Sequence, residues 1–186
     1  MKRIHKNIIS FIVAVCLLSA GLCACSSEDT KEKEAETSPI DYVSEKIPDK
    51  GDSFSKEEKE EIKTGIMGWA SGFLIVDSSI EEEEKMVIDT TLYSSIASDE
   101  DREKLQKDRE KLYTNAEVTV TSVDTKIKDA YKVEYQGSTL GRVSCTIKME
   151  GTRNGKEFKR NYTVKMIINC DDAVSIYEIE KISWKS

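Results

Sequence analysis

The 186-residue chain contains one histidine, His5, which lies within its first 24 residues. The rest of the chain therefore has no imidazole, which excludes Ser-His-Asp and Cys-His nucleophile activation and every zinc site with a histidine ligand. The motifs of nucleotide and redox sites are missing too, because the body has no Cys-x-x-Cys, no GxxxxGK[ST] and no GxGxxG. We assign no catalytic residue and expect neither a cofactor nor a metal site.

Positive charge is scarce relative to negative charge. Lys and Arg total 28 and Asp and Glu total 35, which gives a formal net charge of −7. Three of the basic residues lie in the first 24 positions, so the remainder has 25 basic against 35 acidic residues. An excess of carboxylates opposes contact with phosphates. We therefore expect no nucleic-acid partner and no electrostatic attraction to anionic lipids.

The first 24 residues have the pattern of an export signal. The basic residues Lys2, Arg3 and Lys6 are followed by an apolar run over residues 8–18 and then by small residues. The alternative is a spanning helix, because residues 8–25 are 18 positions without charge, the lower limit for crossing a bilayer. In both cases the basic end stays in the cytoplasm and the acidic body lies on the opposite side of the membrane.

The segment Leu22, Cys23, Ala24 and Cys25 resembles the lipobox of bacterial lipoproteins. In that family an aliphatic residue at −3 and a small residue at −1 precede a cysteine that receives a diacylglyceryl thioether and becomes the mature N-terminus. Cys25 fits this pattern, whereas Cys23 does not, because Leu22 would stand at −1. The resemblance implies lipidation at Cys25 and a body held outside the cytoplasm at the cell membrane. Two acyl chains give a stable anchor.

Both prolines of the chain, Pro39 and Pro48, lie in residues 26–53, a charged stretch with almost no apolar periodicity. This composition is typical of a disordered segment. We therefore divide the chain into a signal peptide (1–24), a lipidated N-terminus with a disordered acidic tether (25–53) and a single α+β domain (54–186). A flexible tether of this length spans on the order of 30 Å, which would lift the body off the bilayer.

The body begins with stretches of helical periodicity. A capping box of Ser55 and Glu58 predicts the start of the first helix. Further helical segments are expected after Ser79 and after Ser98. Glycines inside the first helix each cost about 1 kcal/mol relative to alanine, unless close packing against a sheet requires them. The apolar positions of the first helix recur every three or four residues and are Ile62, Ile66, Trp69 and Phe73.

From residue 116 the apolar period changes to two, which predicts half-buried antiparallel strands. Asn154 and Gly155 are the strongest hairpin signal, since both tolerate the positive φ of a type I′ turn. With that turn, Cys145 faces Val164, and Cys170 lies about 20 Å away along the strands. This distance excludes a disulfide, so we expect two free, buried cysteines. The alternation of apolar and polar residues is broken in the last strand. A β-bulge near residue 177 would explain this shift.

Helices followed by strands predict an α+β fold, with two or three N-terminal helices packed on a curved antiparallel meander sheet of four to five strands. This element order over residues 55–186 resembles the cystatin-like and nuclear-transport-factor-two-like architecture, which is common among small exported lipoproteins of Gram-positive bacteria. The resemblance implies a sheet wrapped on an N-terminal helix. Proteins with this architecture include enzymes, ligand carriers and scaffolds, so the architecture alone does not indicate a function.

Four aromatic residues are candidates for lining a pocket between helix and sheet. Their alternative role is plain packing in the core. The four are Trp69, Phe73, Tyr162 and Trp184.

Together these features predict a membrane-anchored, extracytoplasmic binding or interaction module with an unknown protein or small ligand as partner. One alternative is a small enzyme that uses a carboxylate or tyrosine in the cone of the sheet. It requires a deep pocket with an Asp or Glu of raised pKa. The other alternative is a structural component of an envelope or conjugation assembly. It requires an exposed apolar patch or a free sheet edge.

Overall fold

The computed structural model describes residues 42–171 and 173–185. The predicted signal peptide, Cys25 and the tether as far as residue 41 lie outside these ranges. Within them, no helix is long and apolar enough to cross a bilayer.

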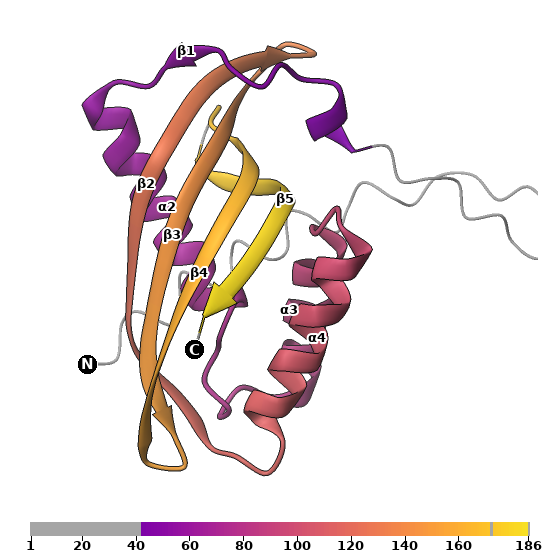
Figure 1. Ribbon diagram of the computed structural model, residues 1–186, viewed down its shortest axis with the longest axis vertical. Coiled ribbons are helices and arrows are strands. Elements are labelled where there is room, and N and C mark those ends of the chain that lie inside the picture. The colour runs from indigo at the N-terminus through magenta and orange to yellow at the C-terminus, as the bar shows by residue number, and fades with distance from the viewer. Residues whose placement is uncertain (1–41, 172, 186) are drawn as a thin grey trace, which may run out of the picture. The chain divides into compact units, whose positions relative to one another are not determined.

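Three helices and a five-stranded antiparallel sheet make up the body (Figure 1), which confirms the predicted α+β class. The first elements are the 3₁₀ turn η1 (Val43–Glu45) and the short strand β1 (Asp52–Ser53). The helices α2 (Lys56–Phe73), α3 (Glu82–Ser94) and α4 (Asp99–Tyr113) follow. The sheet continues with β2 (Val118–Tyr135), β3 (Ser138–Arg153), β4 (Lys156–Asn169) and β5 (Ser175–Lys185). Its strand order, β1-β2-β3-β4-β5, is a meander.

Helix α2 packs behind the sheet in the view of Figure 1, on what we call the inner face, and α3 and α4 lie beside β5. The predicted capping box is confirmed. The Ser55 hydroxyl accepts from the Glu58 amide at 3.2 Å, and the Glu58 carboxylate accepts from the Ser55 amide at 2.7 Å. One stripe of the helix, Ile62, Ile66 and Ala70, is buried against the sheet. The helix is thus held by its apolar stripe, as its periodicity predicts.

The glycines of α2 differ in their surroundings, and this difference gives a testable prediction. A Cβ at Gly65 would lie 2.5 Å from the Cβ of Val174, whereas nothing lies within 4 Å of a Cβ at Gly68 or Gly72. We expect Gly68→Ala to stabilise the protein by about 1 kcal/mol through helix propensity. Gly65→Ala should destabilise it, because Val174 has to move. Urea unfolding measures both, and the opposite order would contradict the packing of Val174 on α2.

The β3–β4 hairpin has the predicted turn and register. Asn154 and Gly155 have φ values of 51° and 73°, and Cys145 pairs with Val164. Both body cysteines are free, as expected. Cys145 is buried, but Cys170 is only half-buried, because it lies just beyond the end of β4.

Burial protects the two thiols from reaction. It raises the pKa of Cys145 to about 12 and the pKa of Cys170 to about 11, so little thiolate exists near neutral pH. We expect a protein that begins after Cys25 to react slowly with a disulfide reagent when folded, with Cys145 slower than Cys170. In denaturant both thiols should react. Fewer than two free thiols in denaturant would contradict the hairpin register.

Strand β5 contains two extra residues relative to β4. The register shifts leave Tyr177 and Glu180 without partners in β4. The bulge near residue 177 is therefore confirmed, and the one at Glu180 is an addition to the predicted pattern. Glu180 forms an ion pair with Arg142 of β3. The second bulge thus has a definite role, because it supplies a carboxylate to an arginine on the outer face.

Residues 42–51, which the composition assigns to the tether, lie on the outer face of the sheet, and we call them the strap. Val43 and Ile47 pack against Val133, Leu140 and Ile167 of three strands. After the strap, β1 pairs with β2. The expectation of a disordered tether is therefore wrong for residues 42–53, because two apolar side chains and a short strand attach them to the sheet.

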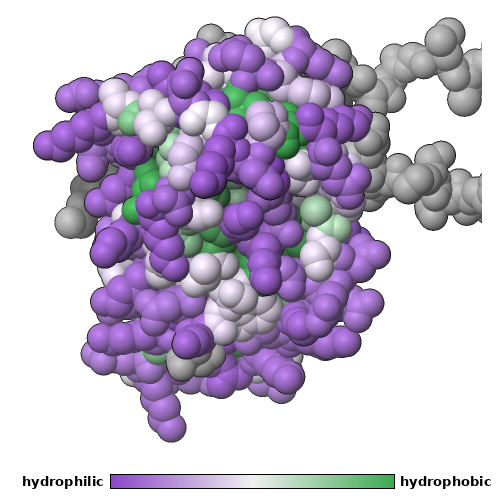
Figure 2. Space-filling view, turned by 45° about the horizontal axis from the view of Figure 1, so that its top comes forward, coloured by the Kyte–Doolittle hydropathy of each residue, from purple (hydrophilic) through white to green (hydrophobic). Residues whose placement is uncertain are grey.

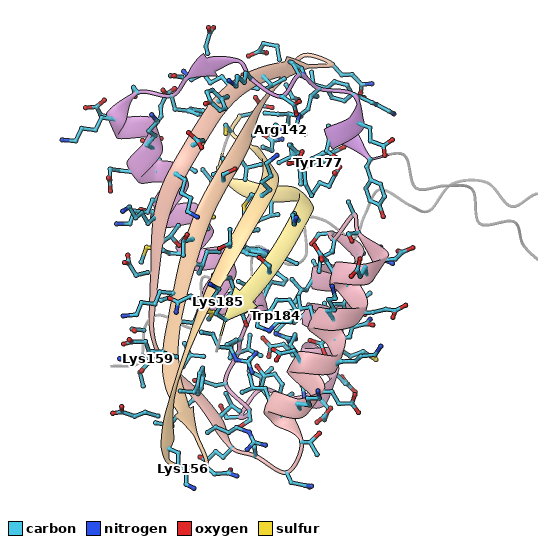
Figure 3. All side chains as sticks on the ribbon, in the orientation of Figure 1. Arg142, Lys156, Lys159, Tyr177, Trp184 and Lys185 are labelled. Atoms are coloured by element: carbon cyan, nitrogen blue, oxygen red, sulfur yellow. The ribbon has the colours of Figure 1, made fainter. Side chains whose placement is uncertain are left out.

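Two charged side chains hold the strap in place. The Glu178 carboxylate, 4% exposed, accepts from the amides of Val43 at 2.7 Å and Ser44 at 3.2 Å. Arg142 donates to three strap carbonyls, at 3.1, 3.2 and 3.4 Å, and pairs with Glu180. Figure 3 shows Arg142 at the end of the sheet that η1 covers. Polar groups of the strap are therefore satisfied by the sheet.

Candidate functional site

The four aromatic candidates belong to the core rather than to a pocket. Trp69 and Phe73 stack with ring centroids 6.5 Å apart, and Tyr162 and Trp184 lie 6.1 Å apart. Tyr162 is fully buried, and the other three are half-buried against the main core. None of them lines either of the two hollows described below. The geometry therefore favours the packing role that the sequence left open.

A groove of about 320 Å³ lies between the first half of α2 and strand β2. Its positions on α2 are three and four residues apart, so they share one side of the helix. Its two lysine positions on β2 are separated by one residue. We call it the lysine groove after the five lysines that line it, Lys56, Lys59, Lys63, Lys126 and Lys128.

The positive charge of the lysine groove is largely unpaired. Glu60 is the one carboxylate in its lining, and Lys63 lies 3.8 Å from Asp124. Among the described residues, none forms an ion pair with the other four lysines. Lysine amino groups gathered in one hollow create a local positive potential even in an acidic chain. The lining of the groove therefore carries a local excess of positive charge.

A buried hydroxyl lies among these lysines. Thr125 is 2% exposed, lines the groove and stands opposite Ile147 on the inner face of β2. Its hydroxyl oxygen has no hydrogen-bond partner within the part of the chain that the structure describes. Leaving such a group unpaired costs about 1–3 kcal/mol. A ligand that hydrogen-bonds to this hydroxyl would remove this cost.

The groove also runs along an open edge of the sheet. Strand β1 pairs only with Tyr131 and Lys132 of β2, and Asp77 accepts from the Val120 amide at 2.6 Å. Between these points, over residues 122–130, no described strand pairs with β2 on this side. An unpaired edge offers backbone donors and acceptors to another extended chain.

A second hollow, of about 520 Å³, lies on α3 beside the exposed Met86. Its lining includes Asp89, which forms an ion pair with the buried Arg109 of α4. On the face drawn in Figure 2, hydrophilic side chains predominate and the apolar areas are small and recessed. The second hollow thus lies over a charge pair that joins two helices. Within the described ranges, none of the residues that line it has a buried polar side-chain atom without a hydrogen-bond partner.

The carboxyl groups with a shifted pKa are shifted downwards. Hydrogen bonds from lysines lower the pKa of Glu58 and Glu100, and those from Lys148 and Lys159 lower the pKa of Glu150 to about 2. A general acid would need the opposite shift. Within the described ranges, no cluster of three or more His, Cys, Asp and Glu residues is placed to hold a metal ion. These groups act as surface ion pairs.

The lysine groove was not found from the sequence, because its lysines come from two elements far apart in the chain. The available signal was Lys126 and Lys128 on one strand and three lysines on the polar side of the first helix. Sequence periodicity does not say which helix lies beside which strand. No protein-family model, curated protein or solved structure matches the chain.

Proposed function

We propose that the protein is a lipid-anchored, extracytoplasmic module that binds an anionic ligand in the lysine groove. The observation that carries the binding role is a group of four unpaired lysines beside a buried, unpartnered hydroxyl, in a chain of net charge −7. Lysines scattered singly over the surface would not line one groove together. The ligand is a protein segment or a small anion, not nucleic acid, because the chain as a whole repels a polyanionic duplex.

The anchoring role is supported by the lipobox-like segment and by the apolar run before it. In this proposal the Cys25 sulfur carries diacylglycerol, and the body lies on the outer side of the membrane. We expect Cys25→Ala to move the protein out of the lipid-anchored pool. Intact mass spectrometry of the membrane fraction measures the modification. An unmodified N-terminus on the wild-type protein would contradict the anchor.

The groove is tested with small probe anions. Full-length protein in a nonionic detergent should bind tripolyphosphate in a calorimetric titration, with an affinity that falls as salt rises. The double variant Lys56→Ala with Lys59→Ala should bind more weakly, because it loses two of the five amino groups. The matched control is Lys104→Ala with Lys107→Ala on α4, which removes the same charge elsewhere. Equal weakening by both double variants would contradict a site in the groove.

For the body we further propose the cystatin-like or nuclear-transport-factor-two-like architecture. The support is a long helix, α2, packed against one face of a meander sheet. A structural role in an envelope assembly is the second candidate, because β2 has the open edge that this role requires. Chemical cross-linking in intact cells would separate them, since a structural component should be joined to a fixed partner in the absence of added ligand.

A further inference from the structure

We propose that the natural ligand is an extended acidic segment of a partner protein, which adds to the sheet as a strand along residues 122–127 of β2. This inference rests on the proposed function and names the ligand class of the same groove. It is carried by two features that lie side by side there: unpaired lysines and an unpaired strand edge.

The lysines are spaced to meet the side chains of a strand. Lys56 and Lys63 are seven residues apart on α2, so they lie about 10 Å apart along the helix axis. Lys126 and Lys128 are about 7 Å apart along β2. Side chains that point to the same face of an added strand also repeat about every 7 Å. Alternate carboxylates of an acidic strand would thus match the spacing of Lys126 and Lys128.

The edge itself is regular where a strand would pair. Register shifts occur between Val120 and Ser122 and between Ile127 and Asp129, so residues 122–127 form an uninterrupted stretch. This stretch is about 20 Å long, enough for several main-chain hydrogen bonds. A compact anion would use the lysines but would leave these backbone groups in water. An extended acidic peptide uses both, which is the usual basis of strand addition.

One pairing between two copies of this chain is disfavoured by the same lysines. In the antiparallel register that sets Lys126 of one β2 edge opposite Lys128 of the other, like charges repel. An acidic strand meets no such repulsion from these lysines.

The test uses a fluorescent peptide of alternating Glu and Thr and a second peptide of the same sequence with alternate amides N-methylated. Both carry the same charge, but the second cannot donate main-chain hydrogen bonds on one edge. Anisotropy titration of full-length protein in nonionic detergent should show binding of the first peptide and at least about tenfold weaker binding of the second, equal to about 1.4 kcal/mol. Lys56→Glu with Lys59→Glu should weaken the first peptide similarly, and Lys104→Glu with Lys107→Glu should not.

The outcomes distinguish strand addition by an acidic segment from the proposed anion-binding function of the lysine groove. Equal binding of the two peptides would overturn strand addition while the anion site stands. Binding of tripolyphosphate without either peptide would show a compact anion as ligand and would also overturn it. Failure of all three probes would contradict the proposed function itself. Thermal unfolding of each variant checks that weaker binding does not result from loss of the folded structure.

Discussion

Replacement of Arg142 by alanine should lower the free energy of unfolding by about 3–5 kcal/mol, the usual effect of removing one partner of a buried charge pair. Arg142 is 12% exposed and Glu180 is 10% exposed, so the carboxylate left behind would stay largely buried. The strap would also lose the guanidinium donor of its carbonyls at Ser44, Ile47 and Pro48. We therefore expect the strap to detach and its apolar contacts to open to water.

Urea unfolding measures the loss, and limited trypsin digestion detects the freed strap, which carries the exposed Lys50. The control is Lys148→Ala on the same strand, whose exposed pair with Glu150 should leave the unfolding midpoint nearly unchanged. The role assigned to this arginine would be refuted if Arg142→Ala unfolded at the wild-type urea concentration and its strap resisted trypsin as well as in the wild type.

Arg109→Ala should have an effect of the same size, about 3–5 kcal/mol. The Arg109 side chain is 2% exposed and donates to the carbonyls of Phe73, at 2.8 Å, and Leu74 at the end of α2. It also pairs with Asp89 of α3. Its loss would leave two helix-end carbonyls and a carboxylate without their partner, and three helices would lose the group that joins them.

Lys107→Ala is the matched control for this prediction, because it lies two residues away on α4. Lys107 forms an exposed pair with Glu103 at 3.5 Å, and its removal should hardly move the urea midpoint. If Arg109→Ala and Lys107→Ala unfolded at the same urea concentration, the buried arginine would not be the joint between the helices.

Local signals in the sequence predicted much of the fold. The capping box at Ser55, the turn at Asn154 and the bulge near residue 177 each depend on neighbouring residues, and each was predicted correctly. The strap was missed because its few apolar residues look like those of a linker. It is attached by Arg142 and Glu178, which lie 95 and 135 residues from their strap partners Ile47 and Val43.

The candidate site was less visible in the sequence. Its lysines resemble ordinary solvated residues until β2 is known to be an edge strand next to α2. The aromatic candidates, in contrast, stand out in the sequence. They do not identify a pocket, because large apolar side chains such as Tyr162 pack in the core as readily as they line a pocket. Which strand becomes the edge is a property of the whole sheet, and local pattern does not determine it.

Amide chemical-shift mapping of the full-length protein in detergent micelles, while the Glu-Thr peptide is added, locates the residues that the peptide contacts. If an acidic strand adds to β2, the largest shifts should fall in residues 122–130 of β2 and in the first half of α2, with little change around the second hollow on α3. Largest shifts on α3, or no shifts at a saturating peptide concentration, would contradict strand addition.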